Sequence, residues 1–109
     1  MDEQPFQVHV RPQRERLVIE AHGEIDLATV PRLREAISTA VADGCRDLVV
    51  DFRAVTFMDS AAVHLLQDLR AMRTDGIDCR LIDGRPEVGR VCSKTRLPSP
   101  STRVASARQ

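Results

Sequence analysis

A serine beside an aspartate, at a point where a strand gives way to a helix, is the feature of this sequence best suited to chemistry. Asp59 and Ser60 follow the apolar pair Phe57-Met58 and precede a helical pattern. Backbone N–H groups are unpaired in the first turn of a helix, and the helix dipole favours negative charge there. A phosphate on Ser60 would therefore be tolerated. The alternative is structural, because Asp and Ser are ordinary caps and the pair would then only cap the helix.

Polar residues continue from Ser60 along one side of this predicted helix. Ser60, His64 and Asp68 are spaced by four residues, a pattern that invites comparison with a Ser-His-Asp hydrolase. We set that interpretation aside because a triad needs an oxyanion hole and a shielded pocket, and the sequence has no Gly-x-Ser-x-Gly elbow. These residues lie opposite the leucines of the same helix and should face solvent. We interpret the polar face, with Ser60, His64 and Gln67, as a surface for docking a partner; His64 alone would otherwise be a solvated surface histidine.

The elements that must position these residues follow from hydrophobic periodicity and from turn residues. Thr29 is the expected N-cap of the first helix, Arg11-Pro12 should end the first strand, and Gly23 should end the second. The predicted elements are strands at 6–10 and 16–22, a helix from 29 to the stop at 43–44, a strand at 48–52, a helix at about 60–74, a strand at 79–82 and a weaker helix at 87–95. The order ββαβαβα predicts an α/β fold in which the first two strands are antiparallel and the later strands parallel.

The apolar stripes of the two longer helices identify the expected core. The first stripe comprises Val30, Leu33, Ile37, Ala40 and Val41, and the second comprises Ala62, Leu65, Leu66, Leu69 and Met72. The strand at 48–52 is apolar on both faces, which indicates a central, parallel position.

Length and charge limit the classes of function. The chain has 109 residues, enough for one domain, and its 16 basic residues balance 16 acidic ones. The balance conceals an acidic body: residues 1–83 hold ten Arg and 15 acids, whereas residues 84–109 are basic. Balanced charge, no Trp or Tyr and only three Phe argue against direct nucleic-acid binding. We expect residues 1–97 to form the domain and residues 98–109 a disordered Ser/Pro/Arg tail.

Membrane insertion, secretion and metal binding are not expected. No apolar run approaches 18 residues, and the N-terminus has neither the positive region nor the apolar stretch of a signal peptide. Cys45, Cys79 and Cys92 lack metal-ligand spacing and are expected to be structural thiols of a reduced protein. These features predict a cytoplasmic protein with no cofactor.

Two segments of this chain resemble the signatures of a known family. The segment from Asp51 to Ser60 is similar to the Asp-Ser phosphorylation motif of STAS domains, and in particular to that of the anti-sigma factor antagonists. The segment from Gly23 to Thr29 resembles the second signature, a Gly-Glu-apolar-Asp turn before the first helix. The resemblance covers about residues 6–97. It departs from the family pattern at Ala62, His64 and the segment 96–98, where the family commonly has glycine, a small residue and glycine, respectively.

The resemblance implies a regulatory switch that is not an enzyme. Such an antagonist binds an anti-sigma factor, itself a serine kinase, and so frees the sigma factor. Phosphorylation of the serine matching Ser60 releases the antagonist, and a serine phosphatase resets it. Asp26 corresponds to the motif aspartate beside that serine. The expected partner-binding residues are thus Asp26, Asp59, Ser60, His64 and Gln67.

Electrostatics fits this expectation. A phosphoserine carries about −1.5 to −2 charges at pH 7, here beside acidic residues, so that a partner surface fitted to the hydroxyl would face like charge. The resemblance leaves other roles open: an accessory subunit of a lipid-transporting ABC complex, or a member of a stress-signalling assembly. It also leaves a homodimer open.

Overall fold

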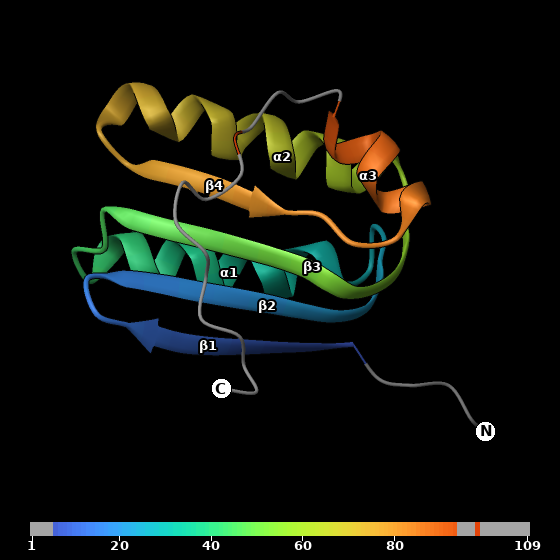
Figure 1. Cartoon of the computed structure of the whole chain (residues 1–109), viewed down its shortest axis with the longest axis horizontal. Coiled ribbons are helices and arrows are strands. Elements are labelled where there is room, and N and C mark those ends of the chain that lie inside the picture. The colour runs from blue at the N-terminus through green and yellow to red at the C-terminus, as the bar shows by residue number, and fades with distance from the viewer. Residues whose placement is uncertain (1–5, 94–97, 99–109) are drawn as a thin grey trace.

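The computed structural model of the chain describes residues 6–93 and residue 98 (Figure 1). The tail predicted at 98–109 therefore lies, apart from Pro98, outside the described residues, as does the predicted end of the last helix at 94–95. The elements are β1 (Gln7–Gln13), β2 (Arg16–Ile25), α1 (Val30–Ala42), β3 (Asp47–Met58), α2 (Ser60–Met72), a 3-10 turn (Arg73–Asp75), β4 (Asp78–Ile82) and α3 (Pro86–Ser93).

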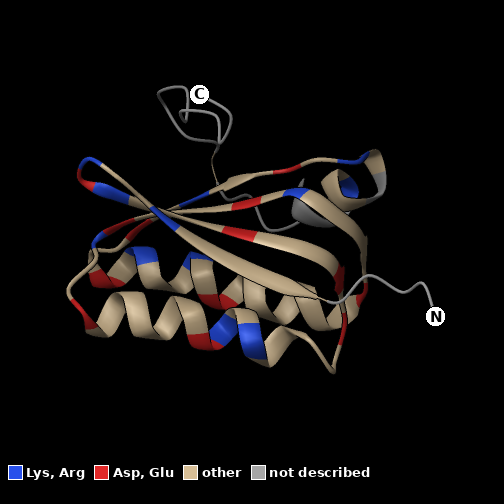
Figure 2. Cartoon of the chain, turned by 90° about the horizontal axis from the view of Figure 1, so that it is seen from below, with Lys and Arg blue, Asp and Glu red and all other residues tan. Residues whose placement is uncertain are grey.

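One four-stranded sheet organises the described residues. Its strand order is β1-β2-β3-β4, with β1 antiparallel to β2 and the other neighbours parallel. This arrangement confirms the predicted fold class. Helices α1 and α2 lie side by side on one face of the sheet, and α3 lies at the end of the other face (Figure 2). Because β2, β3 and β4 are parallel, their C-terminal ends share one edge, and α1 and α2 begin there (Figure 1). We call it the C-terminal edge.

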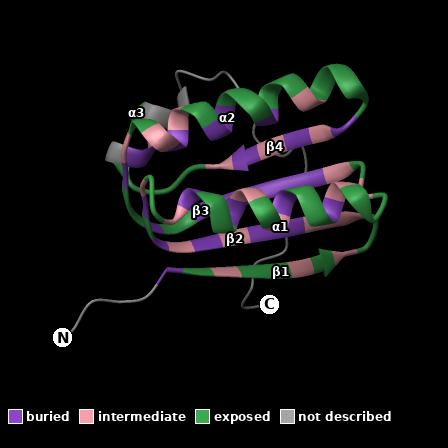
Figure 3. Cartoon of the chain, turned by 180° about the vertical axis from the view of Figure 1, so that it is seen from behind, coloured by how far each residue is buried: buried purple, intermediate pink, exposed green. Residues whose placement is uncertain are grey.

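The core lies between the sheet and the two long helices (Figure 3). The predicted stripes are buried, except that Val41 and Met72 are half-buried. Residues 48–52 of β3 are at most 5 % exposed, which confirms the central position predicted for this strand. Val18 and Val49 form a smaller cluster on the opposite face, where the partly buried Ile82 packs against them.

Three predicted strand ends were wrong. Strand β1 continues through Pro12, because the proline lies on an edge strand where a missing N–H donor is tolerated. Strand β2 continues to Ile25 through Gly23, whose φ of 106° accompanies register shifts on either side. Strand β3 extends six residues beyond the predicted Phe52 and ends at Met58. Strands β2 and β3 therefore carry the turns that follow them, at Asp26 and Asp59, to the C-terminal edge.

A buried carboxylate fixes the middle of β3. Asp51 is 5 % exposed and accepts hydrogen bonds from the Arg53 backbone N–H at 2.9 Å and from Arg53 Nη2 at 2.8 Å. The hydrogen bond with Asp51 raises the pKa of Arg53. Asp51 therefore has a structural role within the motif, since its charge is compensated where it is buried.

The buried thiol of Cys79 should make the free energy of unfolding depend on pH. Cys79 is 1 % exposed, and burial raises the pKa of its thiol from 9.0 to about 11. The neutral thiol stabilises the fold below pH 9, and this contribution is lost as the pH rises towards 11, because the unfolded state then ionises more readily. We expect the wild type to lose up to about 2 kcal/mol of unfolding free energy between pH 8 and 11, relative to Cys79→Ala. Urea denaturation in reductant measures the difference; a parallel decline of both proteins would contradict it.

Candidate functional site

Two turns meet at the C-terminal edge, and they carry the predicted site residues. Ile25 and Met58 are paired across β2 and β3, and the Asp59 N–H donates to the Ile25 carbonyl at 3.2 Å. Asp26 and Asp59 directly follow these paired residues. The two motifs, 33 positions apart in the chain, are thus joined by the sheet register and by a backbone hydrogen bond.

Asp26 organises the first of these turns. Its Oδ1 accepts from the backbone N–H groups of Ala28 at 2.9 Å and Thr29 at 3.0 Å. In return, the Thr29 hydroxyl oxygen accepts from the Asp26 N–H at 2.9 Å and donates to the Glu24 carbonyl at 2.7 Å. This reciprocal pair works as a capping box. Thr29 is the N-cap residue of α1, as predicted, but its side chain makes no capping hydrogen bond to the helix. The turn that leads into the helix is capped by Asp26 instead.

These contacts predict how Asp26 tolerates substitution. Asp26→Ala should lower the free energy of unfolding by about 1 kcal/mol, because two N–H donors lose their acceptor. Asp26→Asn should cost only a few tenths of that, since an amide oxygen accepts the same bonds and Asn is an equally good cap. Urea denaturation of both variants tests this. If Asn were as damaging as Ala, the charge of Asp26 rather than its acceptor geometry would hold the turn.

Asp59 and Ser60 have different roles in the structure: Asp59 caps the helix, and Ser60 presents an accessible hydroxyl. Asp59 is the N-cap of α2, and its Oδ1 accepts from the Ala61 N–H at 2.9 Å. The capping interpretation therefore holds for Asp59. Ser60 is the first residue of α2 and is exposed, and among the described residues nothing hydrogen-bonds its hydroxyl. Its hydroxyl is therefore accessible at the surface of the molecule.

The exposed face of α2 continues from Ser60 to His64 and Gln67, which are both exposed. Asp68 lies on the same face but pairs with Arg34 of α1. Among the described residues, no hydrogen bond links Asp68 to His64 or His64 to Ser60. The geometry gives no support to a hydrolase triad and leaves an open polar surface beside Ser60.

The two segments that converge here are acidic. Residues 21–31 and 54–67 contain Glu24, Asp26 and Asp59 but no Lys or Arg, although the chain has 16 such cations. Acidic residues lie along the turns at this edge in Figure 2. A phosphate on Ser60 would therefore be added to a surface that is already negative.

Sequence reasoning missed two apolar residues at this edge. Leu27 is 80 % exposed and Phe57 is 50 % exposed. Leu27 follows Asp26 in its turn, and Phe57 precedes Met58 at the end of β3. The signal that could have indicated exposure is the position of Leu27, a large apolar residue directly after Asp26 in a turn.

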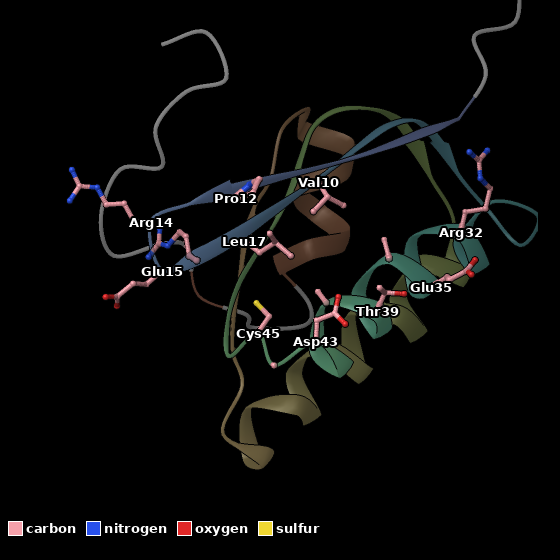
Figure 4. A pocket seen from close by; sticks show the side chains of 14 residues that line it. Val10, Pro12, Arg14, Glu15, Leu17, Arg32, Glu35, Thr39, Asp43 and Cys45 are labelled. Carbon is pink, nitrogen blue, oxygen red and sulfur yellow. The ribbon is translucent and has the colours of Figure 1, made fainter.

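A hollow of about 720 Å³ lies elsewhere, between β1, the start of β2 and α1 (Figure 4). Val10, Leu17 and Cys45 line it, together with Glu35 of α1 and Asp43, the residue that follows α1. None of the predicted site residues lines it. The residues expected from the sequence to bind a partner therefore lie at the C-terminal edge and along α2, away from this hollow.

The described residues contain no group of three or more His, Cys, Asp or Glu side chains arranged to hold a metal ion. Likewise, the part of the chain that the structure describes has no helix long and apolar enough to span a membrane.

Comparison with known proteins identifies the family of this fold. The STAS domain family model matches residues 6–104, most of the chain. The chain belongs to the STAS-domain family. This STAS domain is 30% identical over 80 residues to the anti-sigma-B factor antagonist of Staphylococcus aureus, and the match covers 72% of this chain and 74% of that relative.

Solved structures lead to the same group of STAS proteins. An anti-sigma factor antagonist from Mycobacterium paratuberculosis matches this domain with a TM-score of 0.76 and 27% identity, covering 90% of this chain and 87% of that chain. The anti-sigma factor antagonist SpoIIAA in its unphosphorylated form matches with a TM-score of 0.65 and 31% identity, covering 84% and 80%. SpoIIAA of Bacillus in its phosphorylated form matches with a TM-score of 0.63 and 26% identity, covering 85% of each chain.

Proposed function

We propose that this STAS domain is an anti-sigma factor antagonist that is switched off by phosphorylation of Ser60. The observation that carries the proposal is the exposed Ser60 hydroxyl at the start of α2, joined to the Asp26 turn by the bond between Asp59 and Ile25. The relatives named above are anti-sigma factor antagonists, and one of them has been solved both with and without phosphate. In this role the chain binds a partner and needs no catalytic residue of its own.

The partner of this function is an anti-sigma factor with serine kinase activity. It would contact Ser60, Asp26 and Asp59 at the C-terminal edge and His64 and Gln67 along α2. Binding would release the sigma factor, and a serine phosphatase would later remove the phosphate. Such a protein would work in the cytoplasm, beside the transcription machinery.

Phosphoryl transfer explains why one phosphate can separate the two proteins. A kinase holds the phosphates of its nucleotide in line with the accepting hydroxyl. After transfer, phosphoserine at position 60 faces the phosphates that remain on the nucleotide, with Asp26 and Asp59 beside it. Uncompensated like charge of this kind costs several kcal/mol at an interface, and each 1.4 kcal/mol is a tenfold change in affinity.

The test is phosphate transfer from ATP. The purified chain is incubated with Mg-ATP and, in turn, each anti-sigma factor kinase of its source organism, and the modified peptide is identified by mass spectrometry. We expect one phosphate, on Ser60, and none on Ser60→Ala. Ser38, another exposed helical serine, supplies the matched control, because Ser38→Ala should be phosphorylated like the wild type. If no kinase modifies the chain, or if Ser60→Ala is still phosphorylated, the proposal is wrong.

A further inference from the structure

Two exposed apolar side chains lie on the two segments that meet at the Ser60 site. Three large apolar side chains of the described residues are exposed, and two of them, Leu27 and Phe57, lie on the segments that meet at the C-terminal edge. Single exposed apolar residues are common on protein surfaces, but apolar groups gathered beside a functional site mark contact surfaces. The third such residue, Val10, lies on β1 beside the hollow of Figure 4.

Their positions are fixed by the same contacts that place Ser60. Phe57 is paired with Glu24 across β2 and β3, and Leu27 follows Glu24 by three residues. Neighbouring strands are about 4.8 Å apart and successive Cα atoms 3.8 Å apart, so that the Cα atoms of Leu27 and Phe57 are within roughly 16 Å of each other. A standard interface covers about 800 Å² on each partner and is wide enough to include both residues together with Ser60.

The surroundings specify the chemistry of the surface that would cover them. Glu24 is exposed, Asp26 and Asp59 are half-buried, and neither converging segment contains Lys or Arg. A matching surface would therefore place Lys or Arg around an apolar seat. The interior of an interface is poor in charged side chains and rich in aromatic ones. Phe57 and Leu27 are uncharged and apolar, unlike their acidic neighbours, so they are the residues suited to such an interior.

We infer that Leu27 and Phe57 are apolar anchors for the anti-sigma factor kinase, which would receive them in an apolar seat bordered by basic residues. This assignment rests on the proposed function. Under this assignment the anchors contribute to affinity whether or not Ser60 is phosphorylated. The phosphate on Ser60 then adds the negative charge that lowers the affinity for the partner.

The experiment measures binding to the kinase that phosphorylates Ser60, by titration calorimetry with ADP present. Leu27→Ser and Phe57→Thr should each weaken binding by about 10- to 100-fold, from loss of a buried apolar side chain. Val10→Thr is the matched control, since Val10 is 49 % exposed and Phe57 is 50 % exposed, and it should bind like the wild type. Leu27→Ser alters a side chain that contributes little to folding, so its result stands even if Phe57→Thr proves unstable.

Kinetics of phosphorylation give a second measurement. Because the anchors contact the partner before and during transfer, Leu27→Ser should raise KM for phosphorylation at unchanged kcat. Unchanged affinity and KM for both variants would overturn the assignment while leaving Ser60 phosphorylation intact. An equal loss with Val10→Thr would also overturn it, since the effect would not be local.

The remaining outcomes are equally decisive. If sedimentation shows a wild-type dimer that Leu27→Ser converts to a monomer, a second copy of the chain covers this surface and the assignment is wrong. If no kinase binds or modifies the wild type, the proposed function fails and the anchors fail with it. If the kinase binds and only the variants with altered anchors lose affinity, the assignment stands.

Discussion

Ser60→Glu should lose affinity for the anti-sigma factor kinase by about 100-fold or more. The substitution places a permanent carboxylate beside Asp26 and Asp59, opposite the nucleotide phosphates of the partner, and a repulsion of about 3 kcal/mol corresponds to this loss. The fold should be unaffected, because position 60 is exposed and a negative charge at the first residue of α2 interacts favourably with the helix dipole. Titration calorimetry with ADP measures the affinity, and thermal denaturation followed by circular dichroism checks the fold.

Ser60→Gln is the matched control for this prediction. It adds a side chain of the same size without the charge, so it should lose far less affinity than Ser60→Glu. If Gln and Glu weakened binding equally, size rather than charge would operate the switch. If neither changed binding, Ser60 would lie outside the interface, and the proposed mechanism would fail at this residue.

The sequence predicted the order of the elements and the buried stripes of both long helices because periodicity is a local property. It did not predict where the strands end. The length of β3 depends on its pairing with β2 as far as Ile25 and Met58, and the passage of β1 through Pro12 depends on its edge position. Neither depends on neighbouring residues alone.

At the site, too, local features could be predicted from the sequence and features that depend on distant contacts could not. The chemistry of Asp59 and Ser60 follows from a local cap at a strand-to-helix junction. The closeness of Asp26 to this junction could not be derived in the same way, because the number of residues between two motifs does not give their distance in space. The family resemblance suggested that they are close, and the hydrogen bond from the Asp59 N–H to the Ile25 carbonyl establishes it. Thr29 was correctly predicted as the N-cap of α1, but its reciprocal pairing with Asp26 was not predicted, although the two residues have the three-residue spacing of a capping pair.

Gly84 lies against the backbone of β3, a close approach that no local sequence pattern reveals. Of the substitutions considered, its replacement should lower the stability of the fold most. A Cβ atom at this position would lie 2.8 Å from the Arg53 Cα and 2.9 Å from the Phe52 carbonyl oxygen. Both atoms belong to the backbone of the central strand β3 and cannot move aside cheaply. We expect Gly84→Ala to lower the free energy of unfolding by about 2 to 3 kcal/mol, within the usual cost of overpacking, and to lower Tm by roughly 10 to 20 °C.

Gly89→Ala tests whether that loss comes from the close approach or from the general removal of a glycine. Gly89 lies in α3, and the nearest atom to a Cβ there is the Asp83 Oδ2 at 3.4 Å, an ordinary contact with a side chain. Because alanine is a better helix former than glycine by up to about 1 kcal/mol, this variant should be as stable as the wild type or more so. Opposite signs for the two variants in urea denaturation would establish that the turn between β4 and α3 rests on the backbone of β3. A neutral Gly84→Ala would instead mean that this turn can move away from β3 without loss of stability.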